Sequence, residues 1–556
     1  MRTAVVGGGP GGLFAATLLK LADPSSDVVV FERNRPHDTF GFGVVFSDAT
    51  LRGIDDVDPV LLRALTDDGV HWDEIEVRIH GERWRCGGNG MAAIARMTLL
   101  RLLHDHAGAA GVDLRFEHDI PDPGRLAGDY DLVVGADGAN SVVRRHFEPA
   151  LRPSVTVASA KFIWLATTKL FDGLTFIHER GPDGVFAVHG YPYQVGGTPS
   201  PPGGPDASTF IVETDQTSWR RAGLDAFDVT QPPGPSDMAS KAYLEALFAD
   251  HLDGHPLLVN NSRWGNFRTV RCARWRHDNV VILGDAAHTA HFSVGSGTKM
   301  AMEDAAGLVQ SLAEHPGDLA TALDAFEAAR RPPVDKIQGA AGPSLSWWEH
   351  FGRYHDHLGA AQFSFHFFSR AIPLDKLATR DPRFVTDVSD WWTSHHGAPP
   401  LATPLSVAGR KLDGRVVTVA PPPVGADPVA TVRSGGEELV PFRLPGDPPP
   451  ASGDWGLWLT APDGEAGLSA VITQLEAGIA AGAAVVAVSG GSSVTRVLLC
   501  EEARMVRGAL ALLIDDALRP AQAATLILSG RADLVGASEA VAEAWTAAAS
   551  TIGAPT

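Results

Sequence analysis

The stretch GGGPGG at residues 7–12 constrains the fold of this chain more than any other feature. It satisfies the pattern G-x-G-x-x-G through Gly7, Gly9 and Gly12. An apolar run, TAVVG, precedes it, and a helix-like stretch over residues 11–21 follows. A second apolar run, DVVVFER at residues 27–33, completes a strand, helix and strand unit. In such a unit, backbone amides and the helix dipole hold a pyrophosphate at the glycine turn.

The acidic residue that ends the second strand supports this interpretation. Glu32 follows Gly12 by 32 − 12 = 20 residues. At that distance a carboxylate meets the ribose hydroxyl groups of a bound dinucleotide. Strand, turn, helix and acid together predict a dinucleotide site, which would hold either a nicotinamide nucleotide or FAD. A plain glycine turn with a surface glutamate is the alternative.

Length and composition limit the class of protein. A chain of 556 residues predicts two or three domains. The net charge of -20 argues against a general nucleic-acid binder, which needs a basic face. The three cysteines include no CxxC pair and indicate no disulfide framework, which favours a reducing cytoplasm. No apolar run reaches the roughly 18 residues of a membrane helix, so we expect no membrane partner.

The composition and the hydrophobic pattern of the chain change three times. DYDLVVGAD at residues 129–137 and HDNVVILGD at residues 277–285 are apolar strands that end in polar turns. Residues 161–219, between them, are rich in aromatic and β-branched residues, which is typical of an antiparallel sheet. Residues 301–380 have a helical pattern, and the chain becomes rich in glycine, proline and then alanine beyond residue 400. A sheet domain inserted into an α/β domain, with a separate C-terminal domain, fits this order.

Two further motifs indicate which dinucleotide binds. Residues 135–144 read GADGANSVVR, and Gly284 and Asp285 precede AAHTAHFSVGSG. The glycine fingerprint, then Asp-Gly, then Gly-Asp, resembles the FAD-dependent aromatic hydroxylases, which are single-component flavoprotein monooxygenases. In that family the Asp-Gly motif supports both FAD and the passing nicotinamide. The aspartate of the third motif meets the ribityl chain, and the helix that follows points its positive end at the flavin.

The resemblance narrows to one subgroup. FGFGVVFSDATL at residues 40–51, GNGMAAIARMTLLRLL at 88–103, KFIWLATTKLFD at 161–172, STFIVET at 208–214 and RDPRFV at 380–385 resemble the salicyloyl-CoA and anthraniloyl-CoA hydroxylases. The pigment hydroxylases of violacein biosynthesis are more distant relatives. Fingerprint and resemblance together predict as cofactor-binding residues Gly7, Gly9, Pro10, Gly11, Gly12, Glu32, Arg33, Val44, Arg96, Asp137, Gly138, Gly284, Asp285, Gly295, Gly297 and Thr298.

Asp285, His288 and His291 are spaced three residues apart, as metal ligands can be. The resemblance gives Asp285 to the ribityl chain and makes the two histidines wall residues beside the cofactor. A metal site would need a further ligand cluster, which the sequence does not offer. We therefore expect no metal.

The inserted sheet supplies the candidates for the substrate chamber. His189 and Tyr191 lie two residues apart, which places them on one face of a strand. They are predicted to be catalytic together with Lys161, which could pair with a carboxylate group. Each of the three could equally be structural. The predicted substrate-binding residues are Phe46, Trp164, Glu213, His291 and Phe292.

The C-terminal segment resembles a different family. TPLSVAGRKLDGRVV from residue 403, EAGIAAGAAVVAVSGG at 476–491 and ALRPAQAATLILSGRADLVGAS at 517–538 are similar to the FMN barrel of the old yellow enzyme type. A full (β/α)₈ barrel takes about 250 residues, far more than this segment has. We therefore expect a truncated barrel without FMN, whose role is packing, homodimer formation or partner docking.

The expected architecture is thus α/β, with a Rossmann-like FAD-binding domain, an inserted antiparallel sheet and a C-terminal remnant of a TIM-type barrel. The expected domains are residues 1–150 and 266–400 for the two parts of the FAD-binding domain with its helical closing segment, 151–265 for the substrate domain and 401–556 for the remnant.

The resemblance implies the reaction. FAD reduced by NAD(P)H would add O₂ as a C4a-hydroperoxide, and the distal oxygen would hydroxylate the ring of a salicyloyl- or anthraniloyl-type CoA thioester. The same chemistry on a carrier-bound or free aryl acid, or on an indole, is the first alternative. A flavin-binding scaffold without activity is the second.

Overall fold

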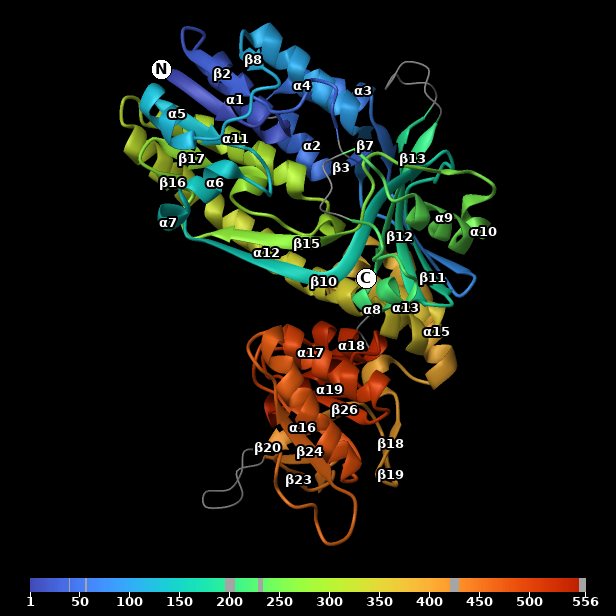
Figure 1. Ribbon diagram of the computed structural model, residues 1–556. Helices are drawn as coiled ribbons and strands as arrows, with labels where there is room; N and C mark the ends of the chain where they lie inside the picture. The colour runs from blue at the N-terminus through green and yellow to red at the C-terminus, as the bar shows by residue number, and fades with distance from the viewer. Residues whose placement is uncertain (40, 56–57, 196–205, 229–233, 421–429, 550–556) are drawn as a thin grey trace. The chain divides into compact units, whose positions relative to one another are not determined.

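The computed structural model describes residues 1–39, 41–55, 58–195, 206–228, 234–420 and 430–549 (Figure 1). It divides into two compact units. The first comprises Met1–Arg78 and Asn89–His350, and the second comprises Ile79–Gly88 and Phe351–Thr556. The second unit begins well before residue 401, where the sequence placed a domain boundary. The helices that follow residue 351 pack on the C-terminal helix α18 (Pro520–Leu528) and so belong to its unit.

A mostly parallel sheet forms the base of the first unit. Its strands contain runs of valine that are buried on both faces, as expected where helices cover a parallel sheet on two sides. All its pairings are parallel except that of β16 with β17. The order is β16 (Arg276–His277), β17 (Val280–Ile282), β9 (Leu132–Gly135), β1 (Arg2–Val6), β2 (Asp27–Phe31) and β8 (Asp113–Arg115).

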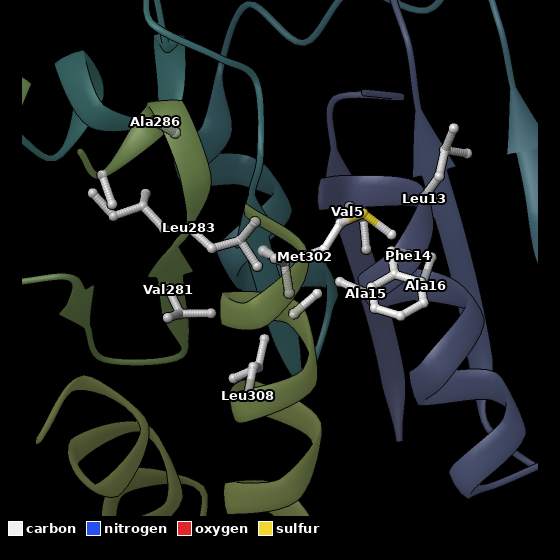
Figure 2. Close-up of a cluster of buried hydrophobic side chains, with 14 of the residues drawn as sticks. Val5, Leu13, Phe14, Ala15, Ala16, Val281, Leu283, Ala286, Met302 and Leu308 are labelled. Atoms are coloured by element: carbon white, nitrogen blue, oxygen red, sulfur yellow. The ribbon is translucent and has the colours of Figure 1, made fainter. Parts of the chain in front are cut away.

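Two helices pack against each other beside this sheet. They are α1 (Pro10–Ala22) and α11 (Gly297–Glu314). Figure 2 shows Phe14 and Ala15 of α1 near Met302 of α11, with Val5 of β1 beside them. Small residues let the two helices approach: a Cβ at Gly11 would come within 3.0 Å of the Ala301 Cβ. The N-termini of both helices therefore belong to one rigid core.

Most strands of a second sheet come from the chain between β9 and β16, and β5 comes from before β9. This sheet is antiparallel except where β11 meets β5. Within the first unit the order is β14 (Leu257–Leu258), β10 (Pro153–Thr167), β13 (Ala207–Thr214), β12 (Gly184–Gln194), β11 (Leu174–Gly181) and β5 (Ile75–Ile79), while β15 (Gly265–Cys272) pairs with β10. A small third sheet contains β3 (Gly43–Ser47), β7 (Met91–Ala95) and β4 (Val70–Trp72).

The two faces of the inserted sheet have different neighbours. One face packs Ile163, Phe210 and Val212 against helices, in a separate hydrophobic cluster with Leu244 and Phe248. The other carries Trp164, Tyr191 and Ile211 in a cluster with residues of the small third sheet. The remaining helices of this unit are α2 (Asp48–Asp55), α3 (Pro59–Asp67), α4 (Arg96–Ala110), α5 (Pro123–Asp129), α6 (Val142–His146), α7 (Glu148–Leu151), α8 (Gln216–Arg221), α9 (Met238–Leu247), α10 (Ala249–Leu252), η1 (Gly284–Ala286) and η2 (Phe292–Val294).

The second unit contains a sheet whose central strands are parallel. The order is β22 (Glu437–Glu438), β21 (Thr431–Ser434), β20 (Val416–Ala420), β27 (Leu534–Ala537), β26 (Leu510–Ile514), β25 (Val485–Ser489), β24 (Gly456–Thr460) and β23 (Phe442–Arg443). The first long strand, β20, thus lies parallel to the last one, β27. Strands alternate with helices along the chain from β24 onward, which explains the alanine-rich helical pattern near the C-terminus.

Pro332, Pro333 and Pro343 lie inside the long helix α12 (Leu319–His357). The other elements of the second unit are β6 (Glu82–Cys86), α13 (Ala360–Phe368), α14 (Leu374–Arg380), α15 (Pro382–His396), η3 (Pro400–Ala402), β18 (Leu405–Val407), β19 (Arg410–Leu412), η4 (Glu465–Gly467), α16 (Leu468–Ala480), α17 (Ser493–Glu501), the π-helical η5 (Glu502–Val506) and α19 (Glu539–Ala548). Among the residues described, no helix has the length and apolarity needed to cross a membrane.

Candidate flavin and substrate site

The glycine turn between β1 and α1 tolerates no side chain at two of its positions. Gly7 has φ +110°, and a Cβ there would lie 2.4 Å from the Ala136 carbonyl oxygen. A Cβ at Gly12 would lie 2.1 Å from the Gly7 oxygen. Gly9 differs, because no described atom lies within 4 Å of the place where its Cβ would be. The turn is therefore packed on one side and open on the other, where the amides of α1 begin.

Glu32 lies beside this turn. Its carboxylate accepts hydrogen bonds from the Gly8 amide at 2.7 Å and from the Asn34 amide at 2.8 Å. The side-chain nitrogen of Asn34 donates a third hydrogen bond to it at 2.7 Å. The carboxylate is thus held at the end of β2, next to the open side of the turn. Arg33, the next residue, is exposed.

Asp137 has one oxygen engaged and one available. Its Oδ2 accepts hydrogen bonds from the amides of Val142 and Val143, at 2.6 and 3.2 Å. Its Oδ1 is buried and has no partner among the residues described. Gly138 follows with φ +78°, a conformation that favours glycine. A buried acceptor without a partner is costly, so Asp137 Oδ1 indicates a ligand that donates a hydrogen bond.

Arg144 joins the two loops that carry the second and third motifs. Its guanidinium donates to the Ala286 carbonyl oxygen at 2.7 Å and to the Ala139 carbonyl oxygen at 2.5 Å. Burial lowers the pKa of Arg144, and the charges of Cys272 and Asp137 oppose this effect. This arginine ends the GADGANSVVR motif, and the sequence interpretation did not assign it a role.

Arg96 and Asp285 bring opposite charges to the same region. Arg96 is the first residue of α4, and its Nε is buried without a partner in the described part of the chain. Burial lowers its pKa, against the charges of Tyr191 and Asp285. Asp285 is exposed, while its neighbours Gly284 and Ala286 are buried. Protein atoms are nevertheless packed around the Asp285 carboxylate, and this desolvation raises its pKa. The charges of His288, Arg96 and Arg144 oppose the rise.

The N-terminus of α11 lies next to Asp285. Gly295 has φ +60°, and a Cβ on Gly297 would come within 4.0 Å of Asp285 Oδ1. Among the residues described, no side chain caps this helix or α1. The first amides of both helices therefore remain available to a ligand. Thr298, in the first turn of α11, is half-buried.

These groups fit FAD. Two uncapped helix ends, the acceptor Asp137 Oδ1 and the donor Arg96 Nε lack partners among the described residues, and they lie around one helix pair. The α1 end would hold the pyrophosphate, and the α11 end would face the flavin ring. Val44 is the exception among the predicted contacts, since it is buried in the main core, where it pairs with Ile94.

The face of the inserted sheet that carries Trp164 also carries a buried group of acid and imidazole side chains. Glu213 Oε1 lies 2.7 Å from His189 Nε2, and Glu213 Oε2 lies 3.6 Å from His291 Nε2. His189 comes from β12, Glu213 from β13 and His291 from the segment before η2. Their contact is produced by strand register, because β13 lies between β10 and β12 and pairs with both.

Aromatic rings surround this group. The His189 ring centroid lies 4.4 Å from that of Trp348 and 4.9 Å from that of Phe176. The His291 ring lies 4.3 Å from Phe292 and 4.9 Å from Phe267. The wall is therefore apolar around a charged centre, as in a site for an aromatic ligand with a polar substituent. Phe176, Phe267 and Trp348 come from three distant segments, so their spacing in the sequence did not identify them as parts of this wall.

The other predicted chamber residues are placed as follows. Tyr191 shares the face of His189, donates a hydrogen bond to the Gly43 carbonyl oxygen at 3.1 Å, and has a pKa raised to about 12 by burial. Trp164 lies against the Gly41 backbone. Phe46 is buried in the main core and is not brought to the histidines.

Lys161 lies on the opposite face of β10 from Trp164. Its Nζ donates to Asn266 Oδ1 at 2.7 Å and lies 4.3 Å from the centre of the Trp219 ring. Burial and the charge of Arg220 lower its pKa. The structure therefore separates Lys161 from His189 and Tyr191, so it does not bring the three predicted catalytic residues together.

The two histidines near Asp285 have different carboxylate partners. His288 Nε2 lies 2.7 Å from Asp304 Oδ2, which also accepts a hydrogen bond from the Gly284 amide. Arg330 binds the other oxygen of Asp304. His288 thus fixes the Gly-Asp loop to α11, whereas His291 faces Glu213. Within the described residues, no group of histidine, cysteine and acidic side chains has the arrangement of a metal site.

Comparisons with known proteins agree with this geometry. Residues 125–340 match the family model described as an FAD binding domain. A salicyloyl-CoA 5-hydroxylase from a Streptomyces species is 54% identical over 97% of this chain and 100% of that protein. The 3-hydroxy-4-methyl-anthranilyl-[aryl-carrier protein] 5-monooxygenase of Streptosporangium sibiricum is 37% identical over 63% of this chain and 89% of that protein.

A solved structure shows the same fold. The tetrameric form of 2-methyl-3-hydroxypyridine-5-carboxylic acid oxygenase superposes with a TM-score of 0.50 at 21% sequence identity. It covers 63% of this chain and 92% of its own. The first relative, by contrast, matches nearly the whole chain and therefore most of the C-terminal segment as well.

Proposed function

This chain belongs to the family of FAD-dependent aromatic monooxygenases, and we propose that it hydroxylates the ring of a salicyloyl- or anthraniloyl-type CoA thioester. The reductant would be NAD(P)H and the oxidant O₂. The observation that carries the proposal is the 54% identity to a salicyloyl-CoA 5-hydroxylase along that protein's full length. Hydroxylation would take place para to the activating hydroxyl or amine.

The residues around the two helix ends would hold the cofactor. The amides of the glycine turn would bind the pyrophosphate, and Glu32 would bind the adenosine ribose. Asp285 would bind a ribityl hydroxyl group, and Arg96 would donate a hydrogen bond to the flavin or its ribityl chain. Bound FAD supplies the activation of O₂. The protein orients the ring against it and excludes water from the site.

The proton chemistry of the substrate would fall to His189 and Glu213. A ring with an ionised hydroxyl is more electron-rich and is hydroxylated more readily. Acceptance of that proton by a neutral imidazole beside Glu213 is general base catalysis. Phe292, Trp348 and Trp164 would enclose the ring, and Tyr191 would fix the β3 segment through Gly43.

A carrier-bound substrate is the second candidate, because a relative with 37% identity acts on an aryl-carrier protein thioester. Both substrates present an aromatic acyl group on a pantetheine arm. In the carrier-bound case the chain would bind a partner protein in place of the nucleotide end of CoA.

We further propose that residues 401–556 derive from a (β/α)₈ barrel that lost its middle. The parallel pairing of β20 with β27 supports this, since the first and last strands of such a barrel are neighbours. The domain layout given by the sequence, an FAD-binding domain in two parts around a substrate domain, is part of the same proposal. The truncated segment would serve packing, homodimer formation or docking.

The test is nicotinamide oxidation by the purified holoenzyme, with product mass measured in parallel. Salicyloyl-CoA, anthraniloyl-CoA and the two free acids would be compared with NADH and with NADPH. We expect thioester-dependent oxidation and a product heavier by one oxygen atom. Oxidation stimulated only by a free acid would overturn the thioester assignment. Bound FAD without nicotinamide oxidation under any of these conditions would favour a scaffold.

A further inference from the structure

Two imidazoles share one buried carboxylate in the candidate substrate site. The side chains of His189, Glu213 and His291 are 4%, 1% and 1% exposed. Glu213 lies 2.7 Å from one ring and 3.6 Å from the other. One histidine is enough to pair with the Glu213 carboxylate, so the second histidine indicates a further role.

The carboxylate is ionised. Burial raises the pKa of Glu213, but the charge of His291 and the close approach of the His189 and His291 rings outweigh it, and the pKa is lowered overall. The charges of His291 and His189 both lower this pKa. A third histidine, His178, stacks on Trp348, with the ring centroids 6.0 Å apart.

The charges of the group balance with one proton on the two rings. One imidazolium neutralises the Glu213 carboxylate. A second imidazolium would leave a net positive charge buried among aromatic rings, which is costly. This charge balance favours one neutral ring beside one imidazolium. The neutral ring can take a proton when an equal negative charge appears beside it, as it does on a ring oxygen that loses its proton.

The Nδ1 side of the His291 ring faces groups that can donate or accept a hydrogen bond. Its Nδ1 lies 2.7 Å from the Ser293 hydroxyl, which can accept or donate, and Ser293 Oγ lies 2.9 Å from Ser344 Oγ. The Ser293 amide also points at Nδ1, from 3.4 Å, which suits the neutral ring. A pair of rotatable hydroxyls can reorient as the proton moves.

We propose that His291 and His189 share Glu213 so that one imidazole stays neutral and accepts the proton of the substrate's ring hydroxyl group. In this step the substrate O–H bond breaks, an imidazole N–H bond forms, and the electron pair stays on the ring oxygen. The proton remains in the site and is available to the product. The inference rests on the proposed function and narrows it.

The proposed proton transfer distinguishes between the two types of thioester substrate. A phenolic hydroxyl gives up a proton to imidazole at a modest cost, whereas an aromatic amine does not lose one near neutral pH. The acceptor therefore assists a salicyloyl-type ring and gives no such assistance to an anthraniloyl-type ring. Among thioesters of equal size, the geometry selects the one with the hydroxyl group.

The test combines three variants of the holoenzyme: His291→Gln, Glu213→Gln and the double variant. The probe is a ring-nitrated salicyloyl-CoA, whose phenolate absorbs visible light. In His291→Gln, Glu213 holds His189 as the imidazolium, so we expect loss of the phenolate band at neutral pH and hydroxylation of salicyloyl-CoA slower by about 100-fold. In the double variant the carboxylate is gone, His189 is neutral again, and the band returns.

Different results would overturn the proton-transfer inference and the proposed function. A double variant no better than His291→Gln, or a His291→Gln enzyme that ionises the probe as the wild type does, would overturn the inference. His291→Asn is a second replacement of this histidine, and it can keep the contact with Ser293. Ser311→Ala, a buried hydroxyl on α11, is the matched control and should behave as wild type. A wild-type enzyme that oxidises a nicotinamide with neither salicyloyl-CoA nor anthraniloyl-CoA would refute the proposed function itself, whereas oxidation with anthraniloyl-CoA alone would overturn only the inference.

Discussion

At the scale of single residues, the site is built from polar atoms that the protein alone leaves without partners. Arg96 Nε and Asp137 Oδ1 are both buried, and within the described residues neither has a hydrogen-bond partner. Unmade hydrogen bonds of buried groups cost about 1 to 3 kcal/mol each. A ligand that makes them stabilises the fold by the same amount. The free enzyme is thus prepared for FAD at a cost in its own stability.

Replacement of Arg96 by methionine tests whether its unpartnered guanidinium nitrogen contributes to FAD binding. The variant loses a charged donor, worth about 1.5 to 3 kcal/mol, so FAD affinity should fall by about 10-fold to 100-fold. The measurement is the quenching of flavin fluorescence on titration of the apoprotein. Arg101, one turn further along α4, is exposed in pairs with Asp68 and Asp105. Arg101→Met should bind FAD as the wild type does, and an equal loss in both variants would refute the role given to Arg96.

The alternation of side chains along a strand explains which residues could be assigned to the substrate chamber from the sequence. His189 and Tyr191 are two positions apart on β12 and share a face, as strand alternation predicts. Lys161 and Trp164 are three positions apart on β10, so a regular strand puts them on opposite faces, and the grouping of Lys161 with the chamber ignored that rule. The contact of His291 with Glu213 spans three elements and no local pattern predicts it.

At the scale of elements, the strand, glycine turn and helix at the N-terminus could be predicted almost completely. Each glycine has a separate physical reason, and the two that tolerate no Cβ belong to the fingerprint. The order of strands in the inserted sheet could not be predicted, because pairing depends on long-range register. The early start of the second unit at residue 351 depends on helix contacts that the sequence does not encode locally.

Alanine at two positions of the turn should have different effects. At Gly7 a methyl group would meet the Ala136 backbone at 2.4 Å in a left-handed conformation, so Gly7→Ala should lower the melting temperature of the apoprotein. At Gly9 the space is open and φ is -80°, so Gly9→Ala should fold normally. Its methyl group would occupy the side from which the pyrophosphate approaches, and FAD affinity should fall. Calorimetry with and without FAD measures both effects. Equal stability losses in the two apoproteins would contradict this account.

At the scale of the whole chain, a buried charge cluster holds the second unit together. Glu501 of α17 accepts hydrogen bonds from Arg353 at 2.7 Å and from the Tyr354 hydroxyl at 2.6 Å, both on α12. His366 of α13 lies 3.1 Å from its other oxygen, and Arg531 follows at 3.8 Å. The helices after residue 351 are therefore tied by charge, as well as by apolar packing, to the C-terminal sheet. The structural role of the truncated segment rests on this cluster.

Removal of the Glu501 carboxylate should lower the stability of the protein. Glu501→Gln leaves buried arginines without their counter-charge, so the free energy of unfolding should fall by about 3 to 5 kcal/mol. Glu476→Gln, which removes a half-exposed partner of Arg507, should cost less than about 1 kcal/mol. Denaturant titration of both variants measures the difference, and a similar small loss in each would show that the cluster does not hold the unit.

The cluster should also make this unit sensitive to acid. Burial lowers the pKa of His366 to about 3, helped by the charge of Arg531 and opposed by Glu501. Burial alone would raise the pKa of Glu501, but Arg353 and His366 bring it down to about 2. Both groups bind protons more readily when unfolded, so stability is lost as pH falls from about 6.5 towards 2. Calorimetry from pH 7 to pH 4 should show a falling melting temperature, and a transition independent of pH would contradict this.

The central claim is that the chain uses FAD and O₂ to place one oxygen atom on the ring of an aromatic thioester. The most direct measurement is the mass of the product formed from salicyloyl-CoA by the holoenzyme and NADH under ¹⁸O₂. The account predicts a product that carries one ¹⁸O atom, with one nicotinamide oxidised for each ring hydroxylated. Nicotinamide oxidation that yields hydrogen peroxide and unchanged thioester, or a product whose oxygen comes from water, would contradict it.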